Sequence, residues 1–204
     1  MAPMTIPSPA YDLRRAVRRT LWILFGGFCL AACSYVALFL VLSLTHPGGL
    51  GLLNPLPTNW DQWRFFFGAL AVAMVYASFR LRMSRLDPAR LVRRARERAE
   101  ARGRETPSRT NGSQAEAREA RLLQDLVGQW ITGHVMVWSL AEVPAILGVI
   151  LLVLSGDGRY FLGMVAVSAI ALFAHRPRDG RWAEILADYH GAGDRAGESG
   201  TAQG

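Results

Sequence analysis

Apolar residues are concentrated in four blocks of the chain instead of recurring at the spacing of a soluble core. The blocks cover residues 21–44, 63–82, 128–155 and 159–175. The first holds 24 residues without a charge, which is enough to cross a hydrocarbon layer of about 30 Å. The second and fourth are shorter, but arginines at their ends can reach the membrane interface and extend them. The pattern predicts an all-α membrane protein whose four transmembrane helices form one bundle over residues 21–175.

The polar segment at residues 83–127 separates the second block from the third and carries helix signals of its own. Asp87 is a good N-cap, and Pro88 after it suits the first helical position, which predicts a helix that stops near Gly103. Its apolar positions form only a weak stripe, so we expect little burial along it. A second helix is predicted to begin at Ser113 and to continue into the third block.

Arginines are distributed unevenly between the segments that flank the blocks. Four precede the first block, 13 lie from Arg80 to Arg121, and none lies between residues 45 and 62. Positively charged segments tend to stay on the cytoplasmic side of a membrane. We therefore expect a cytoplasmic N-terminal segment at residues 1–20, a long cytoplasmic loop between the second and third spans, and a cytoplasmic, mostly disordered tail at residues 176–204.

Composition indicates a multi-pass protein of a bacterial inner membrane. Hydrophobic residues make up 51% of the chain, and all 23 basic residues are arginine. The absence of lysine is typical of a GC-rich coding sequence and hence of a bacterium. The net charge of +7 comes mainly from the long loop, where no aromatic platform accompanies the arginines, so we expect no nucleic-acid partner.

Anionic lipid headgroups are the expected partner of the arginines in and beside the long loop. A contact with a partner protein is the alternative. The candidate headgroup-binding residues are Arg80, Arg82, Arg85, Arg93 and Arg94.

Two cysteines lie four residues apart in the first block. On a helix Cys29 and Cys33 share one face and cannot bridge each other. Packing is the simplest role for both. The segment from Leu30 to Cys33 also resembles the acylation site of bacterial lipoproteins, so lipidation of Cys33 is an alternative. The chain stays apolar for 11 residues beyond Cys33, which argues against lipidation.

Glu142 has the most unusual position of any residue in the chain. It lies near the middle of the apolar run from Gly128 to Ser155, in which His134 is the only other ionisable residue. A charged side chain at this depth costs about 2.5–3.5 kcal/mol on insertion scales. We therefore expect the carboxyl to be protonated, paired or directed toward protein instead of lipid.

Pro144 adds a second unusual feature close to Glu142. Proline removes the amide that would donate to the carbonyl of Leu140, which predicts a kink and a free acceptor near the carboxyl. Such an arrangement can bind an ion inside a membrane. The candidate ion-binding residues are Glu142, Ser139, Leu140 and Pro144. The simpler interpretation is a structural glutamate, protonated or hydrogen-bonded, that joins two helices.

The other polar residues form no recognisable catalytic or metal-binding set. The four histidines are scattered, and the chain contains no HExxH motif, GxSxG motif or Gly-rich phosphate loop. We therefore expect no catalytic residue, metal ion, cofactor or enzymatic activity. Small residues recur every four positions in the first two blocks, which is typical of close helix packing in membranes. These residues are Gly27 and Ala31 in the first block and Ala69, Ala73 and Ala77 in the second.

The segment around Glu142 resembles the ion-carrying helix of the rotary ATP synthase c subunits. In those subunits a carboxylate is followed by Ile, Gly and an aliphatic run, which correspond here to Glu142, Ile146, Gly148 and residues 149–154. The resemblance implies that Glu142 binds a proton or Na⁺ during ion translocation.

Over its whole length the chain resembles uncharacterised bacterial membrane proteins with four helices. The shared features are a Trp-containing first span from Leu21 to Ile23, an Ala-Glu-x-x-Ala-Ile-x-Gly third span, and an Arg-Pro-Arg sequence after the fourth span. This resemblance implies an architecture and no particular activity. The sequence therefore favours a non-enzymatic membrane subunit or scaffold, whose partners are the lipid bilayer and another membrane subunit or a second copy. The alternative function is ion translocation through Glu142.

Overall fold

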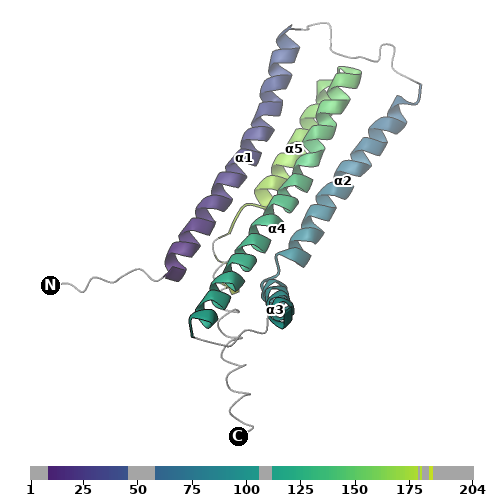
Figure 1. The fold of residues 1–204 in the computed structure, drawn as a ribbon. Helices are drawn as coiled ribbons and strands as arrows, with labels where there is room; N and C mark the ends of the chain where they lie inside the picture. Colours follow the sequence, from purple (N-terminus) through teal and green to yellow (C-terminus); the bar gives the residue numbers. More distant parts are fainter. Residues whose placement is uncertain (1–8, 46–57, 106–111, 179, 181–183, 186–204) are drawn as a thin grey trace, which may run out of the picture. The chain divides into compact units, whose positions relative to one another are not determined.

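The structure is a computed structural model that describes residues 9–45, 58–105, 112–178, 180, 184 and 185. The described residues form five α-helices and no strand. The helices are α1 (Pro9–Thr45), α2 (Trp60–Arg85), α3 (Pro88–Glu105), α4 (Gly112–Ser155) and α5 (Gly158–Ala174) (Figure 1). The predicted all-α architecture is confirmed.

Among the described residues, three helices are long and apolar enough to cross a membrane. These stretches are Arg15–Thr45 in α1, Trp60–Arg85 in α2 and Ala120–Ser155 in α4. Helix α5 is apolar but has 17 residues, or about 25 Å at about 1.5 Å per residue, which is slightly less than the usual hydrocarbon thickness. By length and composition the described residues therefore contain three candidate membrane spans and one shorter apolar helix at the position of the fourth predicted span.

The predicted helix boundaries in the polar segment are largely confirmed. Helix α3 begins at Pro88 and ends at Glu105, two residues beyond the predicted end. Helix α4 begins at Gly112 and runs without interruption to Ser155. Much of the predicted loops and of the tail at residues 176–204 lies outside the described residues.

A two-residue turn joins α4 to α5. Gly156 has a φ of 73°, which glycine adopts without steric cost, and its N–H donates to the carbonyl of Leu152 at 2.8 Å. Asp157 then caps α5, because its carboxylate accepts a hydrogen bond of 3.0 Å from the backbone N–H of Arg159. The short turn makes α4 and α5 antiparallel neighbours.

The chain divides into two compact units. The membrane unit comprises Trp22–Leu81 and Val135–Pro177. The α3 unit comprises Met1–Leu21, Arg82–His134 and Arg178–Gly204.

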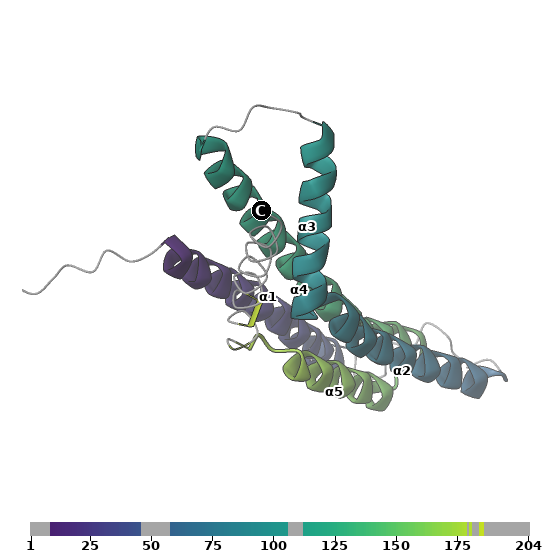
Figure 2. The ribbon, with the colours of Figure 1, turned by 90° about the horizontal axis from the view of Figure 1, so that it is seen from below.

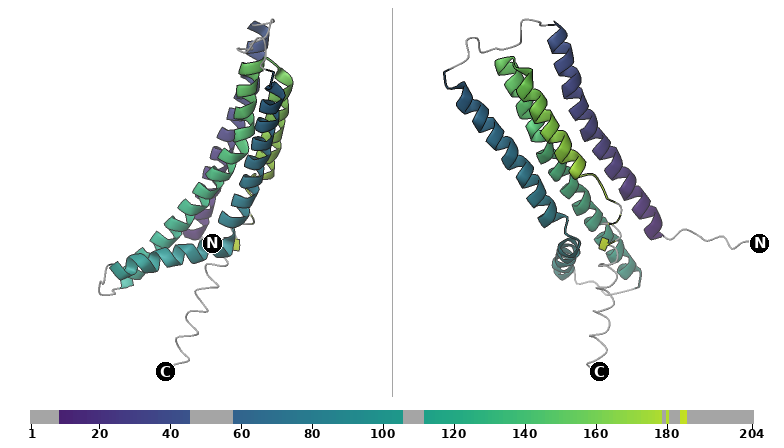
Figure 3. Two further views of the ribbon diagram at one scale, coloured as in Figure 1. Left: turned by 90° about the vertical axis from the view of Figure 1, so that its right-hand side faces the viewer. Right: turned by 180° about the vertical axis from the view of Figure 1, so that it is seen from behind.

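Within the membrane unit, α5 and the second half of α4 form a hairpin with α1 and α2 on opposite sides of it (Figure 1; Figure 3, right). In the most apolar 18-residue segment of each helix, 50% of the residues of α4 are buried, compared with 11% for α2 and none for α1. The hairpin is therefore the centre of this unit, and α1 and α2 keep most of their apolar surface exposed.

A hydrophobic cluster joins α1 to the hairpin. Its buried members are Ala145 and Leu152 from α4 and Phe161 and Val165 from α5. Phe39 of α1 stacks on Phe161 with ring centroids 5.1 Å apart.

Gly148 allows α4 and α5 to approach closely. A Cβ atom at this position would lie 2.8 Å from Cβ of Met164 and 3.2 Å from the carbonyl oxygen of Phe161. Packing against α5 therefore accounts for this glycine, which also belongs to the segment that resembles the ion-carrying helix of c subunits.

Several side chains of α3 are buried, so the expectation of little burial along this helix is wrong. Leu91, Val92 and Ala95 are buried, as is Leu86 just before the helix. Gly133 of α4 supplies the space for Leu86, since a Cβ atom there would lie 2.6 Å from its Cδ2 atom. The two helices lie close together where α3 begins (Figure 2). Helical spacing places only Leu91 and Ala95 on the apolar side of α3. Leu86 and Val92 are buried as well, so the buried surface is wider than that spacing indicates.

Candidate functional site

Glu142 is hydrogen-bonded to a different helix. The hydroxyl of Tyr35, on α1, donates to Oε1 of Glu142 at 3.1 Å. Both side chains are partly buried. Of the described residues, Tyr35 alone hydrogen-bonds to this carboxyl, so the contact joins α1 to α4. The sequence did not indicate Tyr35 as a partner of Glu142, because the two residues are 107 positions apart and no local pattern connects them.

The other candidate ion-binding residues are placed differently from Glu142. Ser139 is exposed, Leu140 is partly buried and Pro144 is buried. At about 100° per residue, Ser139 and Pro144 point away from Glu142 by about 60° and about 160°. Neither the hydroxyl of Ser139 nor a second carboxyl is brought to Glu142 among the described residues.

The carbonyl that gains a partner near Pro144 belongs to Ala141, one residue beyond the predicted acceptor at Leu140. The hydroxyl of Ser168, on α5, donates to it at 2.7 Å, and both residues are fully buried. Proline weakens the hydrogen-bond ladder of the preceding turn, and here α5 satisfies the neighbouring acceptor. That oxygen is consequently engaged between helices and is not presented to an ion.

A second polar contact, which the sequence did not indicate, joins α2 to the end of α5. Oγ of Ser78 lies 2.9 Å from Nε2 of His175. Oγ of Ser78 also donates to the carbonyl of Val75 at 2.6 Å. A hydroxyl has one proton, so His175 donates through Nε2 and Ser78 accepts. Ser78 and His175 are 0% and 1% exposed.

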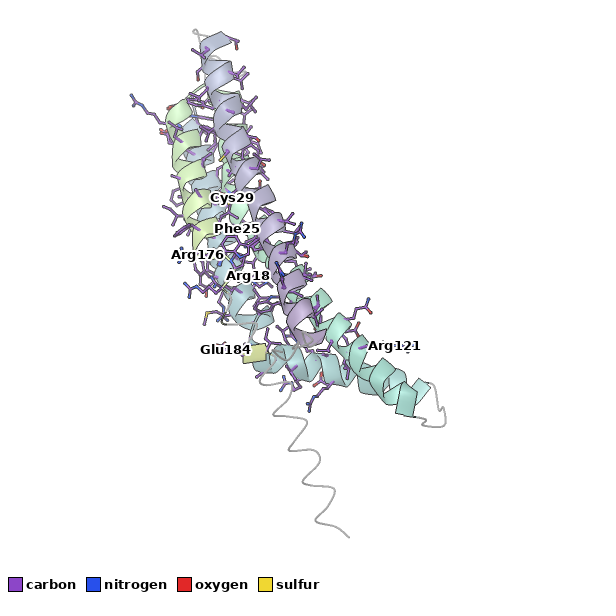
Figure 4. All side chains as sticks on the ribbon, turned by 90° about the vertical axis from the view of Figure 1, so that its left-hand side faces the viewer. Arg18, Phe25, Cys29, Arg121, Arg176 and Glu184 are labelled. Carbon is purple, nitrogen blue, oxygen red and sulfur yellow. The ribbon has the colours of Figure 1, made fainter. Side chains whose placement is uncertain are left out.

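Trp138 of α4 completes this contact. Its Nε1–H donates to the backbone carbonyl of His175 at 3.1 Å. Its ring lies 5.6 Å and 5.7 Å from the rings of Phe25 and Phe28 on α1; Phe25 is labelled in Figure 4. Side chains from α1, α2 and α4 therefore meet at the C-terminal end of α5.

The pairing of Ser78 with His175 is not arranged for nucleophilic catalysis. An activated serine donates its proton to a histidine nitrogen and is open to substrate. Here the serine proton is directed to Val75, and both side chains are buried. The contact is a hydrogen bond between helices.

Other potential ligands are dispersed. In the described ranges, no three His, Cys, Asp or Glu side chains are close enough to hold a metal ion. Cys29 is partly buried and Cys33 exposed, and neither forms a disulfide. His134 is buried with its Nδ1 atom 3.0 Å from the carbonyl of Trp130, one turn earlier on α4.

The candidate headgroup-binding arginines belong to both units. Arg80, Arg85 and Arg93 are exposed, whereas Arg82 and Arg94 are partly buried. Arg93 pairs with Glu97 at 3.6 Å along the exposed side of α3. Exposed pairs of this kind contribute about 0–1 kcal/mol, so this pair holds Arg93 only weakly.

The small residues of the first two spans mostly face outward. Gly27, Ala69 and Ala73 are exposed, and Ala31 and Ala77 are partly buried. A Cβ atom at Gly27 would have no neighbour within 4 Å. Close packing at these positions therefore needs a helix from outside the membrane unit.

The chain was compared with protein-family models, curated proteins and solved structures. No protein-family model, curated protein or solved structure matches the chain.

Proposed function

We propose that this protein is a non-enzymatic subunit or scaffold of a bacterial inner membrane, with four spans in one bundle. The polar contacts of the membrane unit carry the proposal. Tyr35 with Glu142, and Ser78 with His175, form hydrogen bonds between helices, and such bonds help to hold membrane helices together.

The large apolar surface of α1 and α2 supports a role in assembly. Leu30 on α1 is 69% exposed and Phe65 on α2 is 80% exposed. Lipid covers such side chains in part, but the outward small residues on the same helices favour contact with another helix.

Co-purification tests this proposal most directly. The full chain, extracted from its native membrane in mild detergent, should elute with a defined membrane partner or as a defined oligomer. Mass spectrometry and light scattering would identify the species. A chain that is always alone and monomeric contradicts the subunit function.

The proposed topology places both termini and the long loop in the cytoplasm. The arginine asymmetry supports it, and Arg159 and Arg176 at the ends of α5 support a short fourth span, because arginine side chains reach toward the interface. Single cysteines at positions 108 and 54, in a chain whose Cys29 and Cys33 are replaced by serine, test the orientation. Labelling of position 108 from the periplasmic side contradicts it.

Ion translocation through Glu142 is the competing function. One observation favours it: Glu142 is only partly buried, and a single hydroxyl among the described residues hydrogen-bonds to its carboxyl. A carrier of this kind should react with a hydrophobic carbodiimide, and Na⁺ should protect it if Na⁺ is the bound ion.

Glu142→Gln separates the two functions because glutamine still accepts from Tyr35 but does not ionise. Proton and Na⁺ flux in proteoliposomes should fall to background in the variant if Glu142 is a carrier. A normally folded variant with unchanged flux leaves Glu142 as a structural residue.

A further inference from the structure

Glu142 lacks a basic partner within the part of the chain that the structure describes. Its hydrogen bond from Tyr35 uses Oε1, whereas an ionised carboxylate has about four acceptor positions. Acidic residues inside a membrane pair with another polar or charged group because hydrocarbon solvates them poorly.

The side of α4 next to Glu142 is open. Ser139 is exposed and Ile146 is 44% exposed, and both lie within about 60° of Glu142 on the same side of the helix. Trp138 and Ala145 lie on its other side and are fully buried.

The side of α1 next to Tyr35 is open in the same way. Ser34 and Leu38 are exposed. Val36 and Phe39 lie on the other side and pack against the buried cluster that contains Phe161 of α5.

These exposed residues form one face, which we call the α1–α4 face: Ser34 and Leu38 with Ser139 and Ile146, around Tyr35 and Glu142. The buried sides of both helices contact α5, so the exposed sides are directed away from α5. The two serines have short side chains, so another helix can approach the half-buried carboxyl.

We propose that the α1–α4 face binds a transmembrane helix of a different protein, and that an Arg or Lys side chain near the middle of that helix pairs with Glu142. The inference rests on the proposed subunit function and specifies the chemistry of the partner.

Charge argues against a second copy as the occupant. None of the apolar stretches 21–44, 65–79, 128–155 and 160–174 carries an arginine, and the chain has no lysine. A second copy would therefore bring another carboxyl to this depth and no cation to neutralise the first. Only a different chain can supply the basic side chain.

A synthetic transmembrane helix tests the charge pairing. The full chain, with a donor dye at its C-terminus, is reconstituted in phosphatidylcholine vesicles with an acceptor-labelled leucine-alanine peptide that carries one central arginine. The control peptide has leucine at that position. We expect the arginine peptide to bind about ten-fold more tightly, since a polar contact between membrane helices in model peptides is worth about 1–2 kcal/mol.

Variants of the protein locate the binding. Glu142→Gln keeps the acceptor for Tyr35 and should remove the difference between the two peptides. Ser139→Trp should obstruct the face and reduce binding of the arginine peptide. Ile170→Trp is the matched control, because Ile170 is 71% exposed on α5 and lies outside the face. Equal binding of both peptides to the unmodified chain, or a preference that persists in Glu142→Gln, overturns the proposal.

Crosslinking in the native membrane separates this inference from the subunit function. A photoreactive residue at position 146 should capture a protein with an Arg or Lys inside a transmembrane segment, and position 170 should not. Capture of a second copy, or of a partner whose spans lack a basic residue, overturns the inference and leaves the subunit function standing. The absence of any captured protein at either position, together with a monomeric chain in mild detergent, overturns both.

Discussion

Two hydrogen-bonded contacts between helices of the membrane unit differ in how completely they are enclosed. Ser78 and His175 are fully buried where α2 meets the end of α5. Tyr35 and Glu142 are only partly buried where α1 meets α4. The protein encloses the first contact by itself, whereas the open one contains the single carboxyl of the apolar run.

The two contacts should therefore differ in their effects: one on the stability of the fold, the other on the access of binding partners to Glu142. Breaking the enclosed contact leaves a buried donor or acceptor without a partner, which costs about 1–3 kcal/mol. Breaking the open contact lets other groups or water reach the carboxyl, and hydrogen bonds between membrane helices average only about 0.6 kcal/mol. The enclosed contact should therefore stabilise the fold, and the open one should be free for binding.

The largest expected effect is that of Trp138→Ala. Trp138 is 0% exposed and combines aromatic packing on α1 with the hydrogen bond to His175. Its truncation should lower the free energy of unfolding by about 3–5 kcal/mol. Reversible unfolding in mixed detergent and SDS, followed by tryptophan fluorescence or circular dichroism, measures the loss. Phe173→Ala, at an exposed position of α5, should cost far less, and equal losses would show that the enclosed contact has no special weight.

Gly148→Val should have the next largest effect, because it separates the two helices on which both contacts depend. The added atoms would meet Met164 and the backbone of Phe161, and overpacking of this kind costs about 1–3 kcal/mol. Gly163→Val is the control on the same hairpin, since a Cβ atom there has no neighbour within 4 Å. The same unfolding assay applies, and a tolerated Gly148→Val contradicts the close approach of α4 and α5.

Ser78→Ala tests the enclosed contact alone. It removes the hydrogen bond between the Ser78 hydroxyl and Nε2 of His175 and should destabilise the protein by about 1–2 kcal/mol. Ser34→Ala provides the comparison, because Ser34 is exposed and donates only to the carbonyl of Leu30 in its own helix at 2.9 Å. If the two alanine variants unfold alike, the contact between Ser78 and His175 contributes nothing to stability.

Tyr35→Phe should have the smallest effect on stability, about 0.6 kcal/mol. It removes the hydroxyl that donates to Glu142 and keeps the ring. Tyr76→Phe is the control, since Tyr76 is exposed on α2. A loss larger than that of Ser78→Ala would reverse the comparison and make the half-buried contact the main stabilising one.

The sequence by itself determined the long helices and identified Glu142 as an unusual residue. Apolar blocks of sufficient length predicted the long helices, because an α-helix satisfies the backbone hydrogen bonds of such a segment within the segment itself. Asp87 with Pro88 set the start of α3, and the position of Glu142 in an apolar run identified it as the residue that needs a partner. These are local properties, which neighbouring residues decide.

Tertiary structure alone decided which groups meet. Tyr35 lies 107 residues from Glu142 and Ser78 lies 97 residues from His175, so no spacing rule could pair them. The burial of Ala95 likewise depends on the parts of the chain that pack around α3, and not on the pattern of apolar residues within α3 itself. Glu142 is only partly buried because α5 covers one side of this part of α4 and leaves the other side open. Hydrogen bonds and burial between helices arise from the relative position of whole helices, which local sequence does not encode.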